Sequence, residues 1–117
     1  SAYPWCVTFV WWVFREAGFF LAKTASCSEL RRRYQAAGQW VTEGYRPGDI
    51  LLFDFSGRRA KTEHAGILER LEPDGTLVTL EGNTGAGSDA NGGAVMKRRR
   101  DVSLITCGIR PGYPDPA

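Results

Sequence analysis

The chain has 117 residues, a formal net charge of +2 and a hydrophobic fraction of 43%. This length is enough for one domain whose core needs no disulfide bonds, and the small net charge excludes a strong overall attraction to nucleic acid or a membrane. Three cysteines and one histidine, at spacings unlike those of zinc sites, argue against a structural metal. No signal peptide or membrane-spanning run is visible, and the few residues before the first predicted helix suggest a domain excised from a longer protein.

The first predicted element is a helix that begins near Pro4 and ends before Gly18, since proline suits a first helical turn and glycine the position after the last one. From Cys6 to Phe14 every residue except Thr8 is apolar. Such a helix is expected in the middle of a domain and not on its surface. Cys6 falls in the first turn, where unpaired N–H groups and the positive dipole end favour a thiolate. We interpret Cys6 as a candidate nucleophile, and the alternative is a small buried hydrophobe.

A second helix is predicted from a capping box, with Ser26 at the N-cap and Glu29 three residues later. It should run to about Ala37 and end at Gly38. Cys27 also lies in a first helical turn, so the dipole argument does not by itself distinguish Cys27 from Cys6.

Strands dominate the rest of the chain. Apolar or alternating runs predict them at Ile50–Phe53, His64–Leu71, Thr76–Glu81, Ala94–Arg99 and Leu104–Arg110. The turn signature at 46–49 precedes the first of these strands, and a hairpin signal at 72–75 joins the second and third. Helices followed by about five antiparallel strands predict an α+β fold, with Cys107 as an inert core residue.

The hairpin brings possible catalytic residues together. With a four-residue loop at 72–75, His64 lies opposite Asn83, and Gly66 lies opposite Glu81. Because side chains alternate between the two faces of a sheet, the side chains of His64, Glu81 and Asn83 share one face. Asn83 can touch the imidazole directly, and Glu81 can reach it along the diagonal.

A cysteine nucleophile needs a base, which a third polar group usually holds in the required tautomer. Cys6, His64 and either Glu81 or Asn83 supply these three roles in chain order. The sequence therefore predicts a cysteine–histidine site.

Two basic clusters, Arg31–Arg33 and Lys97–Arg100, predict solvated faces of a helix and of a strand end. The alternatives are binding to an anionic wall polymer or to nucleic acid. The regularly interleaved aromatic residues of a nucleic-acid stacking platform are missing from the sequence, and we expect no nucleic-acid partner.

Several motifs follow one another from about residue 3 to residue 113. They are Pro4-Trp5-Cys6, Arg15-Glu16-Ala17-Gly18, Pro47-Gly48-Asp49-Ile50-Leu51-Leu52-Phe53, His64-Ala65-Gly66-Ile67, Glu81-Gly82-Asn83 and Gly108-Ile109-Arg110-Pro111. Together they resemble the CHAP domain of peptidoglycan-cleaving enzymes. The resemblance implies a single papain-like catalytic domain over residues 1–117.

The resemblance also implies an activity. It is hydrolysis of an amide bond in bacterial cell-wall peptide, either as an endopeptidase or as an N-acetylmuramoyl-L-alanine amidase. By position, Cys6 would be the nucleophile, His64 the base, Glu81 its orienting group and Asn83 an auxiliary polar residue. We expect a secreted or wall-associated monomer, or a phage-encoded lysin, with no cofactor and no membrane insertion. The alternatives are a non-catalytic wall- or protein-binding module, and an acyltransferase or thioesterase on the same scaffold.

Two features depart from the family pattern. Trp5 stands where many members carry a Gln that helps to form the oxyanion hole. No acidic residue precedes Cys6, although some members bind calcium there, and Ser88–Gly92 contains only a fragment of a calcium-loop pattern. We therefore expect no metal.

Overall fold

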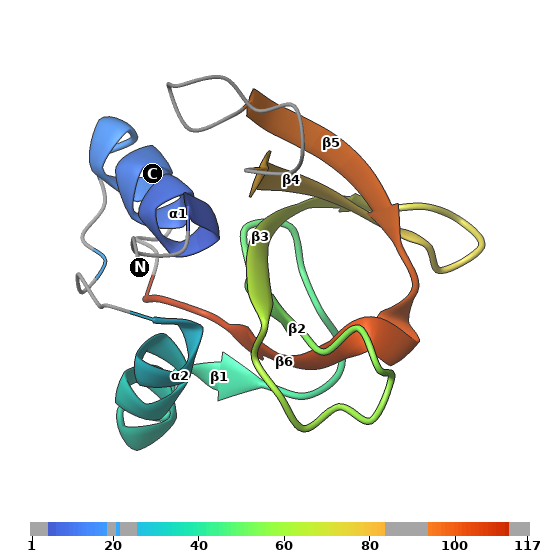
Figure 1. The fold of residues 1–117 in the computed structure, drawn as a ribbon, viewed down its shortest axis with the longest axis horizontal. Coiled ribbons are helices and arrows are strands. Elements are labelled where there is room, and N and C mark those ends of the chain that lie inside the picture. The colour runs from blue at the N-terminus through green and yellow to red at the C-terminus, as the bar shows by residue number, and fades with distance from the viewer. Residues whose placement is uncertain (1–4, 19–20, 22–25, 84–93, 113–117) are drawn as a thin grey trace.

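The fold is that of a computed structural model, which describes residues 5–18, 21, 26–83 and 94–112, with the backbone alone for residues 5–8, 83 and 94. Two helices pack against one six-stranded antiparallel sheet (Figure 1). The elements are α1 (Trp5–Glu16), α2 (Cys27–Ala36), β1 (Trp40–Val41), β2 (Ile50–Phe53), β3 (His64–Leu71), β4 (Leu77–Asn83), β5 (Ala94–Arg100), a 3-10 turn (Val102–Leu104) and β6 (Ile105–Ile109). The strand order is β1-β6-β2-β3-β4-β5. The predicted α+β class is confirmed.

Both helices end as the sequence predicts. Gly18 follows α1 with a φ of 83°, and Gly38 follows α2 with a φ of 73°, a left-handed conformation that glycine adopts without strain. At the start of α2, the hydroxyl of Ser26 accepts a hydrogen bond from the backbone N–H of Glu29 at 3.1 Å. The predicted N-cap is therefore confirmed.

The sheet curves strongly (Figure 1), and it buries apolar side chains on both of its faces. Ile50 and Leu52 of β2 face the helices and join a cluster with residues of α1 and α2. Leu51 and Phe53 point to the other face and pack in a second cluster with residues such as Ile105 of β6. Burial of all four residues of β2 explains its continuous apolar run.

The prediction of a centrally buried first helix is wrong. α1 lies on one face of the sheet, against β3 and β4 (Figure 1). It buries Phe9, Val10 and Phe14, but the side chain of Trp12 is 51% exposed. The guanidinium of Arg15 lies 5.5 Å from the ring of Trp11, a cation–π contact. Within the described ranges, no helix is long and apolar enough to cross a membrane.

The sheet also has one more strand than predicted. β1 consists of Trp40 and Val41 and pairs with β6. Two residues are too few to show alternation, so no pattern of residues indicates this strand. At the other edge, β5 continues to Arg100, one residue beyond the predicted end.

Candidate active site

The register of the β3–β4 hairpin differs from the prediction near its turn. Leu71 pairs with Leu77, so five residues lie between the paired positions, where four were predicted. One extra residue in β3, Glu69, forms a β-bulge and restores the alignment, so that Ile67 pairs with Leu80 as predicted. The two deviations cancel, and the pairs of Leu68 with Thr79 and of Ile67 with Leu80 have the predicted register.

The absence of a side chain at Gly66 lets the side chain of Glu81 lie close to the backbone of β3. A Cβ atom at position 66 would lie 2.7 Å from Cγ of Glu81 and 3.3 Å from the carbonyl oxygen of Leu80. Real side chains do not tolerate the first distance. Glycine is therefore required here by close approach, and the space it leaves holds the side chain of Glu81.

The candidate base and its predicted partner are in contact. Nε2 of His64 lies 2.7 Å from Oε1 of Glu81. The side chain of Glu81 is only 2% exposed and that of His64 is 20% exposed. The expected reach of Glu81 to the imidazole is thus observed. The side chain of Asn83 lies outside the described residues, and its contact with His64 stays a prediction.

Two further residues hold the carboxylate of Glu81. Arg100 donates from Nε to Oε2 at 2.9 Å and from Nη2 to Oε1 at 2.6 Å. The hydroxyl of Thr79 donates to Oε2 at 2.5 Å. Burial by itself would raise the pKa of Glu81, but the hydrogen bonds from Arg100, His64 and Thr79 outweigh it and lower the pKa to about 2.

The ionised carboxylate fixes the tautomer of His64. A carboxylate at neutral pH can only accept hydrogen bonds, so we assign the proton between the two groups to Nε2 of His64. In the neutral ring the lone pair then lies on Nδ1. Nδ1 is therefore the ring nitrogen that can take a proton from a nucleophile and return it.

Aromatic rings line the site beside the imidazole. The ring centroids of Phe53 and Phe55 each lie 5.7 Å from that of His64, and the two phenyl rings stack at 5.8 Å. The guanidinium of Arg100 lies 5.3 Å from the ring of Phe53 and 5.0 Å from that of Phe55. These contacts restrict the orientation of both His64 and Arg100.

Sequence reasoning missed Arg100 and Thr79. Arg100 was assigned to a solvated cluster, but its side chain is 22% exposed and pairs with Glu81, so that assignment is wrong. The available signal was Glu81 itself, because a carboxylate in a core strand needs a buried partner. Because a long segment joins β4 and β5, the register of β5 against β4 could not be predicted, and neither could the pairing of Arg100 with Glu81.

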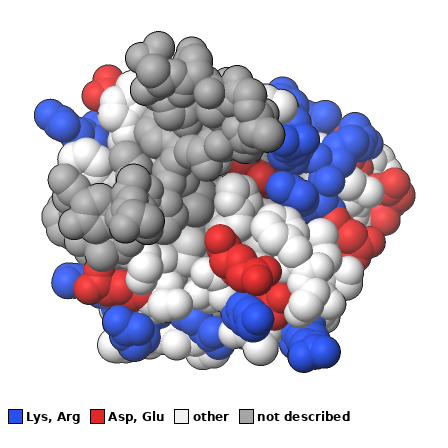
Figure 2. All heavy atoms as spheres, in the orientation of Figure 1, with Lys and Arg blue, Asp and Glu red and all other residues white. Residues whose placement is uncertain are grey.

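The other residues of the basic clusters are largely solvated, as predicted. Lys97 pairs with Glu69 at 3.0 Å and Arg99 pairs with Glu72 at 2.9 Å, both through exposed basic side chains. Figure 2 shows basic and acidic side chains intermixed over this part of the surface. Exposed ion pairs of this kind contribute little to stability.

The candidate nucleophile lies on the helix that packs against these strands. Cys6 is the second residue of α1, and α1 packs on β3 and β4, where Ala65 belongs to the cluster shared with the helix. His64 pairs with Phe53 and lies beside its ring, on the other face of the sheet. The side chain of Cys6 lies outside the described residues, so its meeting with His64 stays a prediction. The proposed calcium-loop fragment, Ser88–Gly92, also lies outside them.

The remaining cysteines are core residues. Cys27 and Cys107 are free of disulfide bonds and buried, with exposed fractions of 3% and 0%. Burial raises the pKa of the Cys107 thiol, an effect only partly opposed by Arg31. A thiol with a raised pKa is a poor nucleophile at neutral pH, which agrees with an inert role for Cys107.

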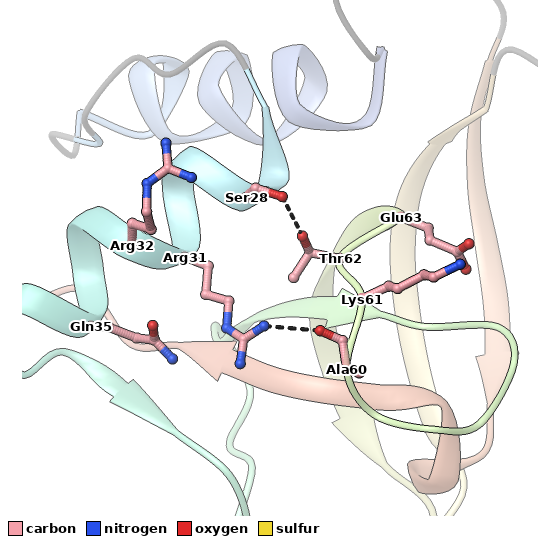
Figure 3. Close-up of a pocket in the computed structure, with 8 residues that line it drawn as sticks. All are labelled: Ser28, Arg31, Arg32, Gln35, Ala60, Lys61, Thr62 and Glu63. Atoms are coloured by element: carbon pink, nitrogen blue, oxygen red, sulfur yellow. Dashed lines mark hydrogen bonds between the residues drawn. The ribbon is translucent and has the colours of Figure 1, made fainter.

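A groove of about 500 Å³ lies between α2 and the segment that leads into β3 (Figure 3). Hydrogen bonds tie its two sides together, from Nη1 of Arg31 to the carbonyl oxygen of Ala60 at 3.0 Å and between the hydroxyls of Ser28 and Thr62 at 2.9 Å. The lining ends at Glu63, one residue before His64 in the sequence, and does not include the candidate base.

Comparison with known proteins gives one match. The family model described as CHAP domain matches residues 1–83. This range includes Cys6, His64, Glu81 and Asn83. No similar curated protein and no similar solved structure was found.

Proposed function

The chain belongs to the CHAP domain family, and on this premise we propose that it is a cysteine-dependent peptidoglycan hydrolase with a papain-like fold. Membership itself points to a hydrolase of the cell-wall type. The finer proposal is that one catalytic domain cleaves an amide bond of the wall peptide, as an endopeptidase or as an N-acetylmuramoyl-L-alanine amidase, outside the cytoplasm. The buried contact between His64 and Glu81 carries this proposal.

In the proposed reaction, Cys6 is the nucleophile and His64 the general acid and base. The thiolate of Cys6 attacks the amide carbonyl carbon and forms a tetrahedral intermediate. As the C–N bond breaks, the imidazolium of His64 gives its proton to the leaving amine, and a thioester remains on Cys6. His64 then takes a proton from water, whose oxygen attacks the thioester, and the acid product leaves with the thiolate restored.

Several observations support this assignment of roles. The first turn of α1 favours a thiolate at Cys6. Glu81 stays ionised and accepts from Nε2 of His64, so it stabilises the imidazolium, and we assign proton exchange to Nδ1. The backbone N–H of Cys6, in a first helical turn where N–H groups have no acceptor within the helix, suits an oxyanion hole that has Trp5 in place of glutamine.

The groove beside α2 is where we place the substrate peptide. Its lining ends one residue before His64 in the sequence, and it includes the basic residues Arg31, Arg32 and Lys61 beside a single acidic residue, Glu63. The basic side chains match the carboxylates of an acidic peptide.

The decisive experiment compares the wild-type protein with Cys6→Ala on purified sacculi. We expect release of soluble muropeptides with new free amines by the wild type and none by Cys6→Ala, with unchanged circular dichroism. Mass spectrometry of the released fragments identifies the bond. Cys27→Ser, at a buried cysteine, serves as the matched control and should keep activity per folded molecule.

Wild-type activity in Cys6→Ala would refute the mechanism. Binding to sacculi without released fragments would instead indicate a non-catalytic wall-binding module. In that case iodoacetamide should label Cys6 no faster than an ordinary exposed thiol at neutral pH.

A further inference from the structure

We propose that Arg100 is a positioning residue for His64, acting through the carboxylate of Glu81. This inference rests on the proposed function, in which His64 moves the proton. The residue comes from β5, beyond the part of the chain that the family model matches.

The first argument is geometric. Arg100 binds both oxygens of Glu81, with Nε on Oε2 and Nη2 on Oε1. A planar guanidinium that donates twice to one carboxylate fixes its position and its rotation. Oε1, which receives His64, is therefore held at one point, and so is the imidazole.

The second argument concerns how Arg100 is itself held. Its guanidinium lies within 5.3 Å and 5.0 Å of the ring centroids of Phe53 and Phe55. The same two rings pack around His64. Base and cation thus share one aromatic wall, which holds the guanidinium in place beside Glu81.

The third argument is electrostatic. Among the described residues, Glu81 receives hydrogen bonds from His64 of β3, Thr79 of its own strand and Arg100 of β5, and Arg100 is the permanently charged one. Because the cation shares the negative charge of the carboxylate, it limits how strongly Glu81 stabilises a proton on His64. Removing the cation must raise the proton affinity of the His64–Glu81 pair.

The single histidine of the chain allows a test that does not need activity. Nuclear magnetic resonance of ¹⁵N-labelled protein gives one set of imidazole signals, which report the pKa and the tautomer of His64. In Arg100→Met we expect the pKa of His64 to rise by about 1, with the proton of the neutral ring still on Nε2 because Glu81 remains its acceptor. Arg100→Lys, which keeps the charge but not the fork, should show a smaller rise.

Arg99→Met is the matched control. It removes an arginine from the same strand and breaks an arginine–glutamate pair with Glu72, but on the exposed surface. We expect the His64 titration of this variant to equal that of the wild type. If Arg100→Met fails to fold, Arg100→Lys carries the test, because its His64 pKa should still exceed that of the wild type.

Kinetics on sacculi supply the second readout. Arg100→Met should lower kcat on the order of tenfold with little change in KM. In a Glu81→Gln background the same substitution should cost much less, because Arg100 acts through that carboxylate.

Unchanged imidazole signals in both Arg100 variants, or additive kinetic losses with Glu81→Gln, would overturn the proposal. The resonance data decide it even in the absence of hydrolysis. A failure of the proposed function is therefore distinguishable from a failure of this inference.

Discussion

In the described part of the chain, arginine binds two buried carboxylates in nearly the same way. Asp49 accepts from Nε of Arg110 at 2.9 Å and from Nη2 at 2.7 Å. Glu81 accepts from the same two atoms of Arg100 at 2.9 Å and 2.6 Å. Their exposed fractions are 1% and 2%. Burial and arginine pairing therefore do not distinguish a functional carboxylate from a structural one.

The remaining partners make the difference. Asp49 also accepts from the backbone N–H of Arg46 at 2.8 Å, and Arg110 donates to the carbonyl oxygen of Gly44. That pair closes a turn. The other hydrogen bonds that Glu81 accepts come from side chains, the imidazole of His64 and the hydroxyl of Thr79. A carboxylate that orients a titratable ring can take part in catalysis, whereas one that binds backbone groups stabilises the fold.

The largest expected effects come from neutralising each carboxylate. Glu81→Gln should lower kcat about a hundredfold, because acid–base groups typically contribute 10²–10⁴-fold and His64 loses its ionised partner. Asp49→Asn should keep the activity per folded molecule but lose about 3 kcal/mol of stability, as expected when a buried pair loses one charge. Hydrolysis assays and chemical unfolding measure the two effects.

The distinction between Glu81 and Asp49 would be contradicted if the two variants showed reversed or equal effects on activity and stability. Full activity in Glu81→Gln would transfer the orienting role to Asn83. Inactive but stable Asp49→Asn would show that the turn at Asp49 shapes the site.

Gly66→Ala tests whether the space beside Glu81 matters. The new Cβ would meet Cγ of Glu81 at 2.7 Å, so the carboxylate must shift away from His64. We expect a loss of kcat on the order of tenfold, since misplacement by about 1 Å can cost as much as a hundredfold. Gly75→Ala, in the hairpin loop with open space around it but a φ of 91°, is a control for backbone strain without displacement of Glu81. Equal activity loss in both variants would contradict the role of Gly66.

Much of the site's local geometry followed from the sequence. The alternation of side chains along two strands placed His64 and Glu81 on one face, and the predicted pairing placed Gly66 opposite Glu81. The prediction survived an error in the turn because the bulge at Glu69 compensated for the longer loop. The β-bulge had no signal in the residues themselves.

The partners of Glu81 could not be predicted for a different reason. Arg100 stands in a run of four basic residues, and only tertiary structure separates the one that pairs with a buried carboxylate from its exposed neighbours. Similarly, the apolar residues of α1 gave no indication that Trp12 would be half exposed. Local patterns fix which face a residue occupies, but not what lies across from it.

The stability that Glu81 contributes should depend on pH. The pKa of Glu81 is lowered from 4.5 to about 2 in the folded protein, so its contribution to stability is complete above the unfolded value. That contribution disappears as the pH falls from about 4.5 toward 2. The stability difference between the wild type and Glu81→Gln should therefore shrink over this range. A stability difference that does not change with pH would mean that the charge of Glu81 does not contribute to stability.

Thr79→Val carries the smallest expected effect and isolates one hydrogen bond. Valine keeps the shape and the strand preference of threonine but removes the hydroxyl that donates to Oε2 of Glu81. Since Arg100 still binds that oxygen through Nε, we expect a loss of about 1–2 kcal/mol in stability and only a severalfold loss in kcat. Thr79→Ser, which keeps the hydroxyl and loses the methyl group, should retain more activity than Thr79→Val. If the two variants lose equal activity, packing at this fully buried position, and not its hydrogen bond, supports the carboxylate.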